Sequence, residues 1–159
     1  MGLDITAYSD LKLDLTAEMD ADGYPVDWNN FVMVWDLTEQ EKLFPGRAGN
    51  LRQGIHSFSD NYGFRAGSYS GYGSWRSWLA QLAGFKDAAD YWNRATPEAP
   101  FYELINFSDC EGFIGHEAAA ELAKDFGAHD GGGGWTGEKY LKWKEACEVA
   151  ARNGAIQFH

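Results

Sequence analysis

Residues 63–85 read GFRAGSYSGYGSWRSWLAQLAGF, and this stretch predicts a strand, a tight loop and a helix in succession. Phe64–Tyr72 is rich in glycine and serine, which disfavour a helix, so we expect a short strand that runs into the loop. Ser74 is then placed to cap a helix, which Gly84 and the apolar Phe85 are expected to end. The apolar residues of this helix follow an i, i+3, i+4, i+7 spacing that gives one buried face: Trp75, Trp78, Leu79 and Leu82.

Two stretches near the ends of the chain are the clearest further strands. Leu3–Tyr8 alternates apolar and polar residues, as a half-buried strand does, and Ala155–Phe158 is a candidate for a strand beside it. Lys12–Glu18 is expected either to pair with the first strand or to form a sheet edge. Phe31–Leu37 has a strand-like composition, and the turn residues of Asp20–Asp27 precede it.

Helical patterns account for most of the remaining chain. Thr38 and Thr136 are expected to cap two helices, and Gly127 to end another. Phe101–Phe107 fits either a buried strand or an apolar turn of helix. The expected helices are a short one after Thr38, then Asp87–Arg94, Glu117–Phe126 and Glu138–Arg152. Together, these strands and helices predict a single α+β domain over residues 1–159, with a small sheet, several packed helices and long irregular loops.

The composition is that of a folded domain, and its charge disfavours one class of function. Of the 159 residues, 45% are hydrophobic and 16% aromatic, which rules out a disordered chain. The formal net charge is −11, so direct binding to nucleic acid is not expected. No apolar run is long enough to span a membrane and no export signal is recognised, so we expect a cytoplasmic location.

The negative charge is concentrated in the first quarter of the chain. Residues 1–44 contain ten acidic and two basic residues, for a net charge of −8, whereas residues 45–159 have a net charge of only −3. One interpretation is a solvated acidic surface that keeps the protein in solution. The other is an acidic face that meets a basic partner or imitates nucleic acid.

The predicted loop before the Ser74 helix is the richest candidate for a ligand site. Its small residues let the backbone approach a ligand, its arginines offer planar forks for phosphate or carboxylate, and its aromatic rings offer stacking faces. The helix N-terminus would add an anion site. The candidate ligand-binding residues are Arg65, Ser68, Tyr69, Ser70, Tyr72, Trp75 and Arg76. The alternative is an irregular loop that aromatic residues tether to the core, since no nucleotide-binding glycine motif is present.

A second stretch, residues 106–116, carries groups suited to hydrolysis. Asp109 and Glu111 would form a carboxylate pair, and His116 would act as a base or as a metal ligand. The simpler interpretation is an Asx-type turn that satisfies backbone amides. The histidines lack metal-ligand spacing and the two cysteines form no C-x-x-C pair, so neither a metal site nor a cofactor is predicted. Cys147 lies on an apolar helical face and is expected in the core.

Several separated motifs occur in an order that is typical of one family. They are MGLDITAY at 1–8, DGYPVDW at 22–28, FPGR at 44–47, GFRAGSYSGY at 63–72, ELINFSDCEGFIG at 103–115 and GAIQFH at 154–159. In these motifs, which extend over nearly the whole chain, the sequence resembles small uncharacterised proteins encoded by tailed phages and prophages of bacteria. The resemblance implies a phage accessory protein that acts in the host cytoplasm. It implies no catalytic residues.

Three functions are consistent with these observations. The first is a non-catalytic inhibitor of a host defence system that binds a host protein through an acidic or aromatic surface. The second is a sponge that sequesters a nucleotide signal, with Arg65 and Arg76 as its anion contacts. The third is a small hydrolase that uses Asp109, Glu111 and His116. The acidic bias favours a protein partner, and the loop of arginines and aromatic residues favours a nucleotide.

Overall fold

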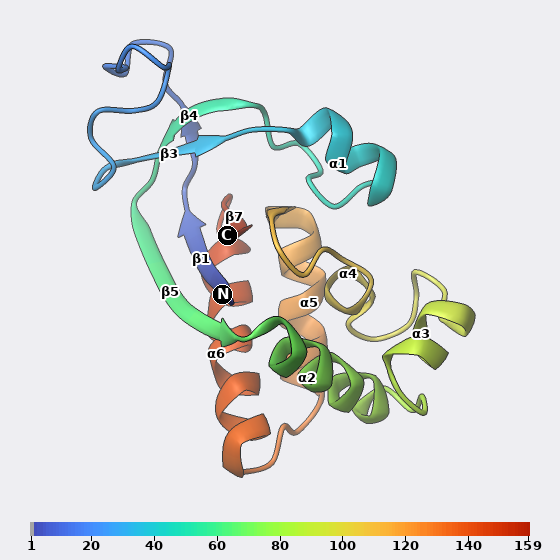
Figure 1. The fold of residues 1–159 in the computed structure, drawn as a ribbon. Helices are drawn as coiled ribbons and strands as arrows, with labels where there is room; N and C mark the ends of the chain where they lie inside the picture. The colour runs from blue at the N-terminus through green and yellow to red at the C-terminus, as the bar shows by residue number, and fades with distance from the viewer. Residues whose placement is uncertain (1) are drawn as a thin grey trace.

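The larger of two antiparallel sheets forms the framework of the molecule. In the computed structural model, which describes residues 2–159, its strand order is β5-β1-β7-β6 (Figure 1). Its strands are β1 (Leu3–Ser9), β5 (Asp60–Gly67), β6 (Gly112–Gly115) and β7 (Ala155–Phe158). The first and last strands of the chain are therefore direct neighbours, as predicted, with Ile5 opposite Phe158. Alternate residues of β1 are buried, so one face of this strand is turned to the core.

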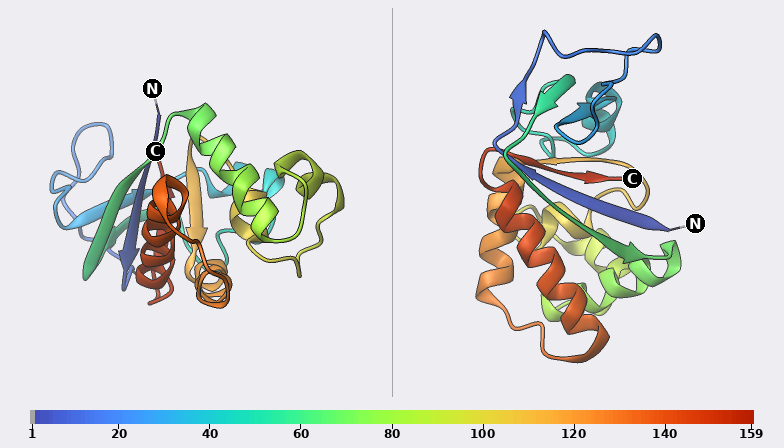
Figure 2. Two further views of the ribbon diagram at one scale, coloured as in Figure 1. Left: turned by 90° about the horizontal axis from the view of Figure 1, so that it is seen from below. Right: turned by 90° about the vertical axis from the view of Figure 1, so that its left-hand side faces the viewer.

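A second, smaller sheet lies above the first and carries the longest loop of the chain. Its strand order is β2-β4-β3, and the short helix α1 (Leu37–Leu43) lies between β3 and β4 in the sequence. Its strands are β2 (Lys12–Leu13), β3 (Phe31–Val34) and β4 (Gly54–Ser57). Residues 14–30, which connect β2 to β3, extend from the body as the blue loops in Figures 1 and 2. We call this segment the N-terminal loop.

Helices cover the core face of the larger sheet. They are α2 (Tyr69–Leu82), α3 (Ala88–Arg94), α4 (Tyr102–Ile105), α5 (His116–Ala128) and α6 (Gly134–Ala150). The last two pack against each other and against the sheet strands, α2 and α3 pack together beside them, and α4 contacts α2, α3 and α5 (Figures 1 and 2). The molecule is thus one compact α+β domain with six helices and two small antiparallel sheets in residues 2–159, and the predicted fold class is confirmed.

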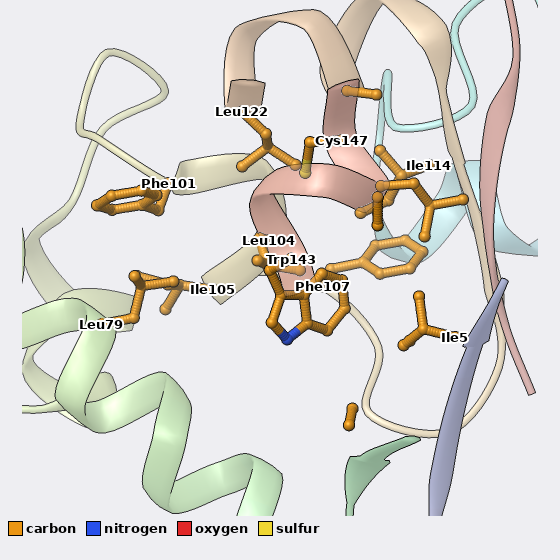
Figure 3. Close-up of a cluster of buried hydrophobic side chains, with 14 of the residues drawn as sticks. Ile5, Leu79, Phe101, Leu104, Ile105, Phe107, Ile114, Leu122, Trp143 and Cys147 are labelled. Atoms are coloured by element: carbon orange, nitrogen blue, oxygen red, sulfur yellow. The ribbon is translucent and has the colours of Figure 1, made fainter. Parts of the chain in front are cut away.

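The core joins the sheet to the helices through large aromatic side chains. Trp143 of α6 lies at its centre, and Figure 3 shows aliphatic and aromatic side chains from strands and helices around it. Cys147, one turn further along α6, is fully buried, as predicted. Burial raises the pKa of its thiol, so the reactive thiolate form is suppressed. Phe101–Phe107 was predicted to be either a strand or a turn of helix, and it contains the short helix α4.

Helix α2 begins five residues before the predicted cap. Ser68, not Ser74, is the N-cap, and its Oγ accepts a hydrogen bond from the amide of Gly71 at 3.1 Å. Ser74 lies inside the helix. The prediction of a loop was wrong because glycine propensity is a weak signal, and the burial of Tyr72 among other aromatic rings outweighs it. The predicted end of the helix is confirmed: Gly84 has a φ of 91° and bonds back to the helix in a Schellman motif.

Other predicted boundaries also differ from the structure. Only Lys12–Leu13 of the predicted strand Lys12–Glu18 is extended, and it pairs with β4 in the smaller sheet. Thr38 caps nothing, because α1 begins one residue earlier, after Asp36. Helix α5 continues through Gly127 to Ala128, and Thr136 lies in the first turn of α6.

Candidate functional site

Three of the predicted ligand-binding residues are buried in the core. Tyr72 and Trp75 of α2 are at most 1% exposed, and both stack on Trp143, with ring centroids 5.8 and 5.7 Å away. Arg76 is 6% exposed, and its Nη1 donates to the carbonyl of Phe107 at 3.0 Å. The alternative interpretation, in which aromatic residues hold this segment to the core, therefore describes it better than a ligand-binding loop.

The charge of Arg76 is balanced inside the protein. Its Nη2 lies 3.5 Å from a carboxylate oxygen of Asp109, and its guanidinium lies over the rings of Tyr72 and Trp92 at 4.8 and 5.4 Å. A carboxylate, a carbonyl and two aromatic faces thus surround this buried cation, while its Nε has no hydrogen-bond partner within residues 2–159. Arg76 thus ties α2 to the loop after α4.

The remaining predicted ligand-binding residues lie at the surface, where β5 meets α2. Arg65 donates from Nη1 to Asp4 at 2.7 Å in an exposed ion pair across the sheet. Ser68 caps α2, and its hydroxyl lies 3.2 Å from that of Ser70. Tyr69 is 41% exposed. These side chains face solvent, whereas Tyr72, Trp75 and Arg76 do not, so the structure does not bring the seven together at one surface.

Each of the three residues of the predicted hydrolytic site has different neighbours. Asp109 is the partner of Arg76. Glu111 lines a pocket of about 160 Å³ beside α1, together with the exposed Cys110. His116 lies in the first turn of α5 and lines a different pocket of about 160 Å³. The pocket that Glu111 lines includes neither Asp109 nor His116, and the pocket that His116 lines includes neither carboxylate.

A second histidine, His56, lines the same pocket as His116. His56 of β4 is 4% exposed, and its Nδ1 lies 3.1 Å from the carbonyl of Gly54. Burial lowers the pKa of His56, and the nearby Arg52 lowers it further. Sixty positions separate the two histidines, so no local spacing could have predicted that they line one pocket.

The His56 pocket is too small for most organic ligands. Drug-sized sites usually have about 300–1,000 Å³, well above its 160 Å³. Within residues 2–159, no group of three or more histidine, cysteine, aspartate or glutamate side chains is arranged to hold a metal ion.

The N-terminal loop is the most unusual part of the surface. It spans seventeen residues without a helix or strand, longer than most loops inside a compact domain, and such loops are commonly functional or disordered. It contains five acidic residues and no basic one. Five of the eleven largely exposed hydrophobic side chains in residues 2–159 belong to it: Leu15, Met19, Tyr24, Val26 and Trp28.

Side-chain hydrogen bonds hold the N-terminal loop in a defined shape. Asp20 accepts from the amides of Asp22 and Tyr24, both at 2.9 Å, and a short bridge pairs Met19 with Pro25. Two further aspartates form similar turns. Asp14 accepts from the amide of Thr16, and Asp27 accepts from the side chain of Asn30; these hydrogen bonds lower the pKa of both carboxyls.

Two acids of the loop have no such structural task. Among residues 2–159, no protein group hydrogen-bonds the carboxylates of Glu18 and Asp22, and both residues are exposed. Their charges are therefore free to act on a molecule outside the fold.

A pocket of about 650 Å³ lies where the loop meets the body. Tyr24 and Trp28 form one wall, with ring centroids 6.2 Å apart, and Trp35 forms another. The full lining is Asp22, Gly23, Tyr24, Trp28, Met33, Trp35 and Gln157. Its volume lies within the usual range for ligand-binding sites, and its lining is mainly aromatic with one carboxylate. We call it the aromatic pocket.

The two sides of the aromatic pocket differ in their contacts with the rest of the protein. Trp35 packs edge-on against the buried Phe113 with a centroid distance of 5.3 Å, and Gln157 accepts a hydrogen bond from Tyr8 at 3.1 Å. Tyr24 and Trp28 belong to the N-terminal loop and are about half exposed. The pocket therefore has one wall, at Trp35, on the body and another on the N-terminal loop.

Comparison with known proteins identifies no relative: neither a family model, nor a curated protein, nor a solved structure matches the chain. Within residues 2–159, no helix is long and apolar enough to cross a membrane.

Proposed function

We propose that the chain is a non-catalytic binding protein that docks on another protein through the N-terminal loop and the aromatic pocket. The observation that carries this proposal is the composition of the loop surface. Exposed aromatic and aliphatic side chains lie there beside acidic residues, and the loop contains no basic residue. Apolar side chains clustered on a surface and rimmed by charge are typical of protein–protein interfaces.

The partner that fits this surface is a protein with a basic and partly apolar face. Acidic charge concentrated on one side of a molecule increases the rate of encounter with such a partner and disfavours acidic ones. The resemblance to phage and prophage accessory proteins supports a bacterial host protein as that partner, met in the host cytoplasm. Inhibition of a host defence system is the activity that we propose for the complex.

The nucleotide sponge and the small hydrolase receive less support from the side-chain arrangement. The sponge needs Arg76, Tyr72 and Trp75 at the surface, and these three side chains are in the core. The hydrolase needs Asp109, Glu111 and His116 near one substrate, but Asp109 is paired with Arg76, and His116 and Glu111 line different pockets.

The test compares charge reversal on the loop with charge reversal on the body. A Glu18→Lys, Asp22→Lys double variant changes the two acids without a structural task and leaves the turn of Asp20 intact. The matched control is Glu121→Lys, Glu148→Lys, which changes the same charge on α5 and α6, where both glutamates form exposed ion pairs.

Each variant is used as bait in a lysate of host bacteria, and the captured protein is identified, purified and titrated against the baits at several salt concentrations. We expect the control to bind like the unaltered protein, and the loop variant to bind at least tenfold more weakly and with a smaller dependence on salt. Equal loss of affinity in both variants, or no loss in either, would refute the loop as the docking surface.

A further inference from the structure

The aromatic pocket has the features of a site for a single positively charged side chain. Tyr24, Trp28 and Trp35 line it together, and they are 49%, 55% and 38% exposed. Asp22 brings a carboxylate to the same pocket, and no protein cation in residues 2–159 is paired with it. We propose that this pocket binds an arginine side chain of the partner protein, an inference that rests on the proposed function and specifies its contact.

Aromatic faces favour a cation over a neutral or negative group. The face of an aromatic ring carries negative potential, which attracts a guanidinium or ammonium within about 6 Å of the ring centre. Tyr24 and Trp28 lie close enough, at 6.2 Å between centroids and 34° between ring planes, for one planar group to contact both. Asp22 adds a full negative charge and a hydrogen-bond acceptor at the rim.

The rest of the lining supports a cation with a long apolar stem. Met33 offers a flexible, polarisable wall for methylene groups, and Gln157 offers an amide. No lysine or arginine lines the pocket, and the adjoining loop contains acids alone among its charged residues. A phosphate or carboxylate would therefore meet repulsion without any compensating charge.

Arginine suits the pocket better than lysine. Its guanidinium is planar, stacks on aromatic rings and is weakly hydrated, so it loses less on leaving water. Its fork also matches the two oxygens of Asp22 in a way that a single ammonium does not. The same molecule already uses this arrangement internally, where Arg76 lies over Tyr72 and Trp92 and reaches Asp109.

The test uses three short peptides that differ in one side chain: acetyl-Gly-Ala-Arg-Ala-Gly-amide, its lysine counterpart, and its citrulline counterpart, which has the shape of arginine without the charge. Each is titrated into the full-length ¹⁵N-labelled protein, and the indole N–H signals of Trp28 and Trp35 are followed by NMR. We expect saturable shifts with the arginine peptide, several-fold weaker binding of the lysine peptide, and at least tenfold weaker binding of the citrulline peptide.

Variants locate the site. Trp28→Ala should abolish the saturable shift of Trp35, and Asp22→Asn should weaken arginine-peptide binding several-fold. Trp135→Ala is the matched control, because Trp135 is also half exposed but lies at the start of α6, away from the pocket. Thermal melts of all three variants show whether the fold is retained.

Three results would overturn the inference: equal affinity for the arginine and citrulline peptides, no saturable shift with any peptide, or unchanged binding in folded Trp28→Ala. Equal affinity would mean that the pocket takes an apolar group without regard to charge. None of these results affects the capture experiment with Glu18 and Asp22, so failure of the arginine site is distinguishable from failure of the docking surface.

Discussion

The body of the molecule and its N-terminal loop use the same aromatic residue types in opposite ways. In the body, Tyr72, Trp75 and Trp143 stack on one another and are at most 1% exposed. In the loop, Tyr24 and Trp28 are about half exposed. The body rings stabilise the fold by leaving water, whereas the loop rings add little to the fold and remain available to another molecule.

Acidic residues show the same division between structure and surface. Asp20, like Asp14 and Asp27, closes a turn by accepting backbone hydrogen bonds. Glu18 and Asp22 are a few residues away and have no such bonds within the described chain. The loop is therefore shaped by some of its acids and charged by the others. A variant that removes the charge without the shape must change only Glu18 and Asp22.

The largest effect on stability is expected from Trp143→Ala. This change removes a fully buried ring at the centre of the core, and such truncations cost about 3–5 kcal/mol. Trp28→Ala, by contrast, should change the free energy of unfolding by no more than about 0.5 kcal/mol. Urea denaturation of both variants checks the contrast. Comparable losses of stability would mean that the loop ring belongs to the fold.

The next largest effect on stability is expected from Arg76, one of the two arginines that were predicted to share a ligand site. Arg76→Met keeps the apolar stem but removes the hydrogen bond to Phe107 and the partner of Asp109, so we expect a loss of about 1.5–3 kcal/mol. Arg65→Met breaks only the exposed pair with Asp4 and should cost less than about 1 kcal/mol. Thermal or urea unfolding distinguishes them. A larger loss of stability in Arg65→Met than in Arg76→Met would contradict the structural role of Arg76.

A smaller change in the free energy of unfolding, dependent on pH, is expected from His56 in the smaller sheet. The folded state lowers the pKa of His56, mainly by burial, so protonation favours unfolding. The free energy of unfolding should therefore fall as pH drops through about 6.5, the ordinary pKa of histidine. His56→Gln should show a flatter profile between about pH 7.5 and 5.5. The control is His159→Gln, at an exposed position. A profile that His56→Gln leaves unchanged would contradict this assignment.

Local signals made much of the fold predictable. The strand at Leu3–Tyr8, the helix end at Gly84 and the short helix predicted at Asp87–Arg94 each depend on neighbours in sequence, and all three are confirmed. The start of α2 was not predictable in this way. Gly71 and Gly73 disfavour a helix by their low helix propensity. The packing of Tyr72 against Trp143 outweighs this preference, and Trp143 lies on α6, far from Tyr72 in the sequence.

The candidate site was only partly predictable for a similar reason. The charge imbalance of the first quarter and the turn at Asp20–Asp27 are visible in the sequence, whereas the exposure of Trp28 and Trp35 is not, because large aromatic residues are usually buried. The aromatic pocket also includes Gln157 from the last strand, which reaches the loop only through the pairing of β7 with β1. Such a site depends on topology.

The most direct test of the central claim measures stability and partner binding on the same preparations of Trp28→Ala and Trp135→Ala. The partner is the purified protein obtained by capture. We predict that both variants unfold at urea concentrations close to that of the unaltered protein, that Trp135→Ala binds normally, and that Trp28→Ala binds at least tenfold more weakly. Normal binding by folded Trp28→Ala would contradict the claim that the N-terminal loop is the docking surface.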